Sequence, residues 1–249
     1  MSDAAIGHQA EPSRQGYPLF YQQPEVLRAE VHGELELRPE VSFEFARTSS
    51  GIPLNAAEFP VAARDYPIVL VGDETPVPVA IVGLRKNENL MIAGDDTWAD
   101  GAYVPAYVRR YPFVFVRDQN SDQFALCIDG VCERIARGSE HPFFIDGEPA
   151  ETTRRALEFC TAFQQHSNAT NRICQALREK DLFRAKKIEF TLKSGEKLEL
   201  RDFRIIDEEK LNALPDDDFI ALRQSGALAV IYCHLMSMNS WPALLSRIE

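Results

Sequence analysis

The sequence predicts an α+β protein, with a β-rich body over residues 17–146 and a mainly helical portion over 150–249 that carries one β-hairpin. Short apolar runs between turn residues fill the first part, which is typical of strands. The stretch from Thr152 to about Lys180 contains neither proline nor glycine, which favours a long helix. We expect residues 17–249 to form a single domain, preceded by a mobile tail over residues 1–16.

The β-rich part opens with alternating apolar and polar residues. Leu35 and Leu37 alternate with charges and the alternation resumes over 41–46, so we predict a strand with one buried face. Residues 55–63 predict a short helix that Pro60 interrupts, because proline suits a first turn and not a helix interior. Compact apolar runs then predict two strand pairs, at 66–71 with 77–84 and at 113–116 with 124–128.

Residue spacing predicts the elements of the helical part. Apolar and polar residues alternate around Ser194-Gly195, which predicts a hairpin at 187–192 and 197–200. Acidic residues predict the starts of two short helices at Asp207 and Asp216, and an apolar helix follows over 227–238. The long helix has one face of small and apolar residues that we expect to be buried, namely Ala156, Cys160, Phe163, Ser167, Thr170, Cys174 and Leu177.

Composition limits the partners and the compartment. The formal net charge of −11 opposes attraction to phosphate backbones and anionic lipids, so we expect no nucleic-acid partner. An odd set of five cysteines, and an N-terminus without a basic segment followed by an apolar core, favour the reducing cytoplasm. The apolar run over 227–238 is about half of the roughly 20 residues that a spanning helix needs, so we expect a buried helix and no membrane span.

Residues 83–113 concentrate polar and aromatic side chains between apolar runs, where a folded domain usually places a site or a strained turn. In the functional interpretation, two arginines anchor a carboxylate or phosphate, asparagines supply amide contacts, and aromatic rings form an apolar wall for a small molecule or extended peptide. The candidate ligand-binding residues are Arg85, Asn87, Asn89, Trp98, Tyr103, Tyr107, Arg109 and Arg110.

A structural interpretation of the same residues competes with the functional one. The asparagines Asn87 and Asn89 would occupy a turn, the arginines Arg109 and Arg110 would pair with nearby acids, and the aromatic rings would belong to the core. Both interpretations remain open at the level of the sequence.

Few other residues indicate chemistry. Glu58 and Glu88 are candidate general acids or bases, although Glu58 also suits a helix start. Cys127, Cys132 and His141 form a loose C-x4-C…H series, but a closed zinc site needs four ligands at tighter spacing, so we expect buried cysteines and no metal. The sequence contains no dinucleotide, phosphate-loop or G-x-S-x-G motif, and we expect no cofactor.

Several segments of this chain resemble the bacterial SapC family: RDYPIV at 64–69, GLR and NENL within 83–90, Trp98, and YVPAYVRRYPF at 103–113. DEEKLNALP at 207–215 and SGAL at 225–228 are similar to the family's second block, and the resemblance covers roughly residues 16–245. The family is named after a protein associated with a bacterial surface layer, and the resemblance brings no catalytic residues with it. Its relatives tend to be encoded near flavin-dependent tryptophan halogenase-like proteins and outer-membrane receptors, which implies an accessory role.

These observations favour a non-catalytic accessory or binding protein that handles a peptide, a small anionic or aromatic ligand, or a protein partner. The first alternative is an enzyme of unrecognised type, with Glu58 or Glu88 as base and the arginines as anchors in the same pocket. The second is a surface-layer-associated structural protein, which should expose a large apolar patch and a sizeable symmetric interface. Surface association follows from the family name alone.

Overall fold

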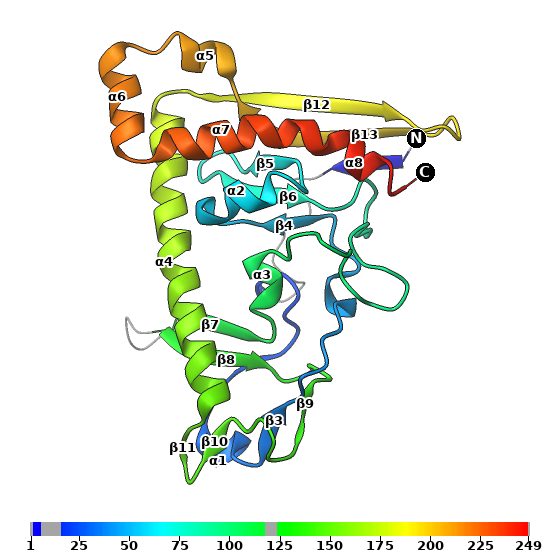
Figure 1. Cartoon of the computed structure of the whole chain (residues 1–249), viewed down its shortest axis with the longest axis vertical. Coiled ribbons are helices and arrows are strands. Elements are labelled where there is room, and N and C mark those ends of the chain that lie inside the picture. The colour runs from blue at the N-terminus through cyan, green and yellow to red at the C-terminus, as the bar shows by residue number, and fades with distance from the viewer. Residues whose placement is uncertain (1, 6–15, 118–123, 249) are drawn as a thin grey trace. The chain divides into compact units, whose positions relative to one another are not determined.

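The computed structural model of the chain describes residues 2–5, 16–117 and 124–248 (Figure 1). The chain divides into two compact units: unit 1 comprises residues 1–11, 43–107 and 166–249, and unit 2 comprises residues 12–42 and 108–165. The single domain over 17–249 stays a prediction, since it concerns cooperative folding. Of the predicted mobile tail, Ser2–Ala5 form a strand and Gly16 is described, while residues 1 and 6–15 lie outside the described residues.

Unit 1 is built on a mixed β-sheet. The strand order is β1-β13-β5-β6-β4, and β12 also pairs with β13. The predicted hairpin is confirmed as β12 and β13, which are antiparallel and turn at Gly195, whose φ of 86° suits glycine. The predicted central pair is confirmed as β5 and β6. The strands are β1 (Ser2–Ala5), β4 (Gly51–Pro53), β5 (Ile68–Val71), β6 (Val77–Ile81), β12 (Phe183–Thr191) and β13 (Lys197–Ile206).

Helices pack on this sheet around an apolar core. The core joins Leu70 of β5, Leu177 of the long helix and Ile206 of β13 to the C-terminal helices, of which α7 runs along β12 and β13 (Figure 1). The two helices predicted from acidic residues are confirmed as α5 and α6. Asp207 accepts hydrogen bonds from the N–H groups at the start of α5, and Asp216 lies in the first turn of α6. These helices are α2 (Phe59–Ala62), α5 (Glu208–Asn212), α6 (Asp216–Gln224), α7 (Ala227–Ser237) and α8 (Trp241–Leu245), with short 3-10 helices at Glu44–Ala46, Ala56–Glu58 and Met238–Ser240.

The predicted apolar helix is confirmed as α7, and further helical turns extend the stretch to Leu245. Within the described residues, Ala227–Leu245 is the one helical stretch that is long and apolar enough to cross a membrane by length and composition, and it has 19 residues. Core helices also meet these criteria, and buried His234 accepts a hydrogen bond from the N–H of Ile206 at 3.0 Å, which ties α7 to β13. One face is therefore buried as expected, while Tyr232 and Met236 on another face are exposed. The absence of a membrane span stays a prediction.

Unit 2 combines small sheets with the first half of a long helix. The second predicted strand pair is confirmed as β7 and β8, to which β2 adds an antiparallel edge. Phe113, Ile128 and Phe143 form the core with Ala156 and Cys160 of the helix. The strands are β2 (Pro24–Val26), β3 (Leu35–Leu37), β7 (Phe113–Arg117), β8 (Phe124–Asp129), β9 (Ile135–Arg137), β10 (Phe144–Ile145) and β11 (Glu148–Pro149). The short helices are α1 (Ala29–His32) and α3 (Ala106–Arg109), and the first two residues of α3 belong to unit 1.

The long predicted helix is confirmed as α4 (Glu151–Glu179), a continuous helix of 29 residues. Residues 151–165 belong to unit 2 and residues 166–179 to unit 1. Its predicted face is buried at Ala156, Cys160, Thr170, Cys174 and Leu177, as the spacing of three and four requires.

The strand predicted over residues 35–46 is only partly correct. Leu35–Leu37 form β3, but Glu44–Ala46 form a 3-10 helix. The ring of Phe43 packs edge-on against Trp98 at 5.5 Å, and its N–H donates to the carbonyl of Asp96 at 2.9 Å. A turn buries these aromatic residues as well as a strand would, so the alternation alone did not distinguish the two.

Candidate functional site

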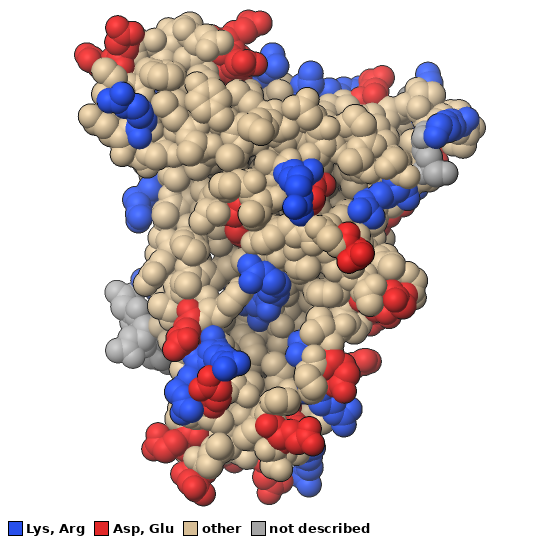
Figure 2. Space-filling model, in the orientation of Figure 1, with Lys and Arg blue, Asp and Glu red and all other residues tan. Residues whose placement is uncertain are grey.

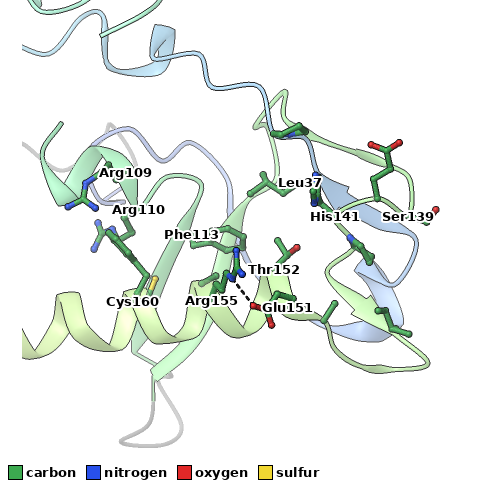
Figure 3. A pocket seen from close by; sticks show the side chains of 17 residues that line it. Leu37, Arg109, Arg110, Phe113, Ser139, His141, Glu151, Thr152, Arg155 and Cys160 are labelled. Carbon is green, nitrogen blue, oxygen red and sulfur yellow. Dashed lines mark hydrogen bonds and ion pairs between the residues drawn. The ribbon is translucent and has the colours of Figure 1, made fainter. Parts of the chain in front are cut away.

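A cavity of about 580 Å³ opens within unit 2 (Figure 3). Its volume lies in the range typical of small-molecule sites, roughly 300–1,000 Å³. Five segments line it: β3 and the residues after it, the chain from α3 to β7, the loop 139–142, β10, and the first turns of α4 with the residue before them. Side chains from distant parts of the sequence thus meet around one open cavity.

Two arginines form one end of the cavity, where Figure 3 shows Arg109 and Arg110 beside Cys160. The exposed Arg109 places its guanidinium over the ring of Phe159, 5.4 Å from the centroid. The guanidinium of Arg110, which is only 9% exposed, lies 4.5 Å from the centroid of Phe163. Aromatic rings hold both cations in place. This end can attract a carboxylate or phosphate.

The middle of the cavity is apolar. Phe113 of β7 and Ala156, Phe159 and Cys160 of α4 face it. Burial raises the pKa of the Cys160 thiol to about 11, although the nearby positive charge of Arg110 lowers it in part. A neutral thiol is a poor nucleophile. Cys160 therefore acts as part of the apolar wall.

The opposite end is a loop that carries Ser139, Glu140 and His141 (Figure 3). The carboxylate of Glu36 accepts hydrogen bonds from the backbone N–H groups of Glu140, at 2.8 Å, and His141, at 3.2 Å. A Cβ atom on Gly138 would come within 2.2 Å of that carboxylate. The Glu36 side chain thus fixes the loop, and the glycine leaves room for it.

We expect Glu36→Ala and Gly138→Ala each to destabilise the protein by about 1 kcal/mol, the typical net value of a hydrogen bond. Because both changes disturb one contact, the double variant should be little worse than either single variant. Unfolding in urea measures this, with Gly94→Ala as control, since a Cβ there meets nothing within 4 Å. Fully additive effects would show that Glu36 does not hold the loop through Gly138.

A third arginine lies between the two ends of the cavity. Arg155 of α4 donates to the carboxylate of Glu151 at 2.7 Å, one helical turn away (Figure 3). Glu151 lies in the first turn of the helix, where the helix dipole favours an acidic residue. The pair adds one positive and one negative charge to the wall, and these two charges balance each other.

The structure separates the candidates that the sequence grouped together. Arg109 and Arg110 belong to unit 2 and line the cavity. The other eight candidates belong to unit 1 and do not line it: Glu58, Arg85, Asn87, Glu88, Asn89, Trp98, Tyr103 and Tyr107.

Glu58 fixes the backbone of unit 1. Its side chain is 6% exposed, and one carboxylate oxygen accepts hydrogen bonds from the Tyr103 hydroxyl at 3.0 Å and the N–H of Ala106 at 2.7 Å. The other oxygen accepts from the N–H of Asn55 at 2.8 Å, which completes a capping box. The carboxylate is thus surrounded by donors from its own chain, as the structural interpretation of a helix-start residue expects.

The aromatic candidates of unit 1 are packed inside it. The indole N–H of Trp98 donates to the hydroxyl of Tyr66 at 3.0 Å, and that hydroxyl in turn donates to the carbonyl of Tyr103. Burial raises the pKa of Tyr66, so the hydroxyl keeps its proton for this chain of hydrogen bonds. Tyr107 is 9% exposed. These rings contribute to the core of unit 1.

The polar candidates at 85–89 form a tight turn. Asn87 has a φ of 58°, a conformation that asparagine tolerates. Arg85 pairs with Glu88 at 2.9 Å and with Glu196 of the hairpin at 2.7 Å. Buried Asn89 donates to the carbonyl of Ala46 at 3.0 Å. The structure therefore brings these residues together as a turn fastened to the rest of unit 1.

Sequence reasoning missed Glu140, Arg155 and Phe159 as residues of the cavity. One feature of the sequence could have indicated Arg155 as a residue with a functional role. Arg154 and Arg155 lie close to the start of a helix, where the helix dipole disfavours positive charges. His141 was considered only as a metal ligand. Among the described residues, no group of three or more His, Cys, Asp or Glu side chains is placed to hold a metal ion.

A protein-family model described as SapC matches residues 27–244, a range that includes residues of both units. No curated protein and no solved structure matches the chain.

Proposed function

The chain belongs to the SapC family, and on that premise we propose that it is a binding protein whose cavity in unit 2 takes a small molecule with an anionic group and an apolar body. The observation that carries this proposal is the juxtaposition of Arg109 and Arg110 with an apolar wall in one cavity. This combination orients the ligand and also binds it tightly. The two arginines hold the anionic group of the ligand in place, and the apolar wall removes the rest of the ligand from water.

Electrostatics support the choice of an anionic ligand. The protein carries a net charge of −11, which repels anions in general, so a cavity with two arginines at one end stands out against that background. The neutral thiol of Cys160 argues for binding over covalent catalysis at this place. In this role the protein would act as an accessory that delivers or holds a ligand for a partner, and the five free cysteines support a reducing compartment.

Titration calorimetry on the full chain tests this function. The probes are inorganic phosphate, benzoate, indole-3-acetate, octanoate and a short peptide with free termini. We expect at least one of the four carboxylates to bind, and Arg109→Gln to weaken that binding about tenfold or more, as the loss of a charge-assisted hydrogen bond does. Arg109 is exposed, so the variant should fold normally.

Arg137→Gln is the matched control. This arginine belongs to the same unit and is 84% exposed, but it does not line the cavity. Equal losses in both variants would mean that binding follows overall charge and not the cavity. If none of the four carboxylates binds wild-type protein, the proposed function is wrong.

A further inference from the structure

The charges of the cavity differ between its two ends, and this difference indicates what the ligand is. Arg109 and Arg110 form one end, and the loop with Ser139 and His141 forms the other (Figure 3). Glu140, between these two residues, also lines the cavity. Within the described residues, the carboxylate of Glu140 makes no hydrogen bond or ion pair. A ligand with an anion at one end and a cation at the other would be complementary in charge to the two ends.

The helix α4 gives the distance between the two ends. The Arg109 guanidinium lies over Phe159, next to Cys160. The carbonyl of Phe143, just after the loop, accepts hydrogen bonds from the N–H of Ala150 and the hydroxyl of Thr153. The two ends therefore contact the helix between six (159 − 153) and nine (159 − 150) residues apart, which corresponds to roughly 9–14 Å, or a middle value of about 12 Å, at a rise of about 1.5 Å per residue.

We propose that the ligand is a short peptide with free termini, about three to four residues long, whose carboxylate faces Arg109 and whose amino group faces Glu140. An extended chain covers roughly 3.3–3.6 Å per residue, so roughly 12 Å corresponds to this length. The proposal rests on the proposed function and narrows its ligand to one chemical class.

The middle of the cavity fits the side chains of such a peptide. Phe113, Ala156 and Phe159 present apolar surface between the charged ends. An apolar or aromatic residue in the middle of the peptide would pack there, while the peptide backbone stays near the open side of the cavity. The charged ends of the cavity fix the direction and the length of the bound peptide, and the apolar middle supplies most of the contact area.

The test uses the tripeptide Ala-Phe-Ala and three blocked forms: the C-terminal amide, the N-acetylated peptide and the doubly blocked peptide. Titration calorimetry measures each against wild-type protein, Arg109→Gln and Glu140→Gln. Removing the charge at either terminus should weaken binding to wild type about tenfold, the scale of one charge-assisted contact. The doubly blocked peptide should be the weakest.

The variants should respond selectively. Arg109→Gln should bind the amide nearly as well as the free acid, because the partner of the carboxylate is gone, but it should still discriminate against the acetylated peptide. Glu140→Gln should show the reverse pattern. These opposite responses of the two variants form a double-mutant cycle between protein and ligand. They assign each terminus of the peptide to one end of the cavity. Glu133→Gln, an exposed change in the same unit outside the cavity, should behave as wild type.

Other results separate the two proposals. If benzoate, indole-3-acetate or octanoate binds in an Arg109-dependent manner and the tripeptide does not, the peptide inference is wrong and the proposed function stands. If acetylation has no effect on binding to wild type, the ligand is an anion without a cationic end, and the inference is again wrong. If no carboxylate of either kind binds, both proposals fail.

Discussion

Replacing Glu58 by alanine is expected to destabilise the protein by about 3–5 kcal/mol, because the change leaves one buried and two partly buried donors without their acceptor. These donors are the N–H groups of Asn55 and Ala106 and the hydroxyl of Tyr103. Each buried donor without a partner costs about 1–3 kcal/mol, and partial access of water to the site keeps the sum below the maximum. The loss should appear as a lower urea midpoint and a lower thermal midpoint.

Two further variants make the Glu58 result specific. Asp100→Ala removes an exposed carboxylate from the same unit and should change stability by less than about 0.5 kcal/mol. Glu58→Gln keeps one carbonyl oxygen and should lose less than Glu58→Ala. A Glu58→Ala protein of normal stability would contradict the structural role and reopen the interpretation of Glu58 as a general base.

His234 is expected to make the protein less stable in mild acid. Its side chain is completely buried in α7, and burial lowers its pKa from 6.5 to about 4. Since the ring takes up a proton more readily when the chain is unfolded, acid favours the unfolded state. The contribution of His234 is fully present above pH 6.5 and is lost progressively as the pH falls from 6.5 to about 4.

The size of this effect follows from the shift in pKa. A difference of about 2.5 pKa units, at 1.36 kcal/mol per unit, corresponds to about 3 kcal/mol between neutral pH and pH 4. The hydrogen bond from Ile206 to Nε2 requires the neutral ring, which agrees with this direction. Protonation would turn that acceptor into a second donor facing a donor.

Urea unfolding between pH 4 and pH 8 measures the contribution of His234. The glutamine of His234→Gln can still accept a hydrogen bond from the N–H of Ile206. This variant should lack the wild-type loss of stability between pH 6.5 and 4. Its stability at pH 8 should be lower than that of wild type, because a buried amide replaces the ring. His166→Gln changes an exposed histidine and should keep the wild-type pH dependence. Parallel curves for wild type and His234→Gln would show that acid sensitivity comes from other groups.

The sequence by itself determined the elements whose causes are local. The long helix α4 follows from a stretch without proline or glycine, and its buried face follows from small and apolar residues spaced three and four apart. The hairpin of β12 and β13 follows from the alternation of apolar and polar residues around Gly195. Pro60 was expected to suit only a first turn, and it lies in the first turn of α2. In each case the backbone hydrogen bonds or the repeat lie within a few residues, so a short window of sequence contains the cause.

Only the tertiary structure decided which polar residues form a site. Arg109, Glu140 and Arg155 meet at one cavity because strand pairing and the packing of α4 bring distant segments together, and no local pattern encodes that meeting. The donors that surround Glu58 likewise include Tyr103, which is distant in sequence. Sequence shows which groups can bind a ligand, but whether a group faces a cavity or is satisfied by its own chain depends on the three-dimensional arrangement of the whole unit.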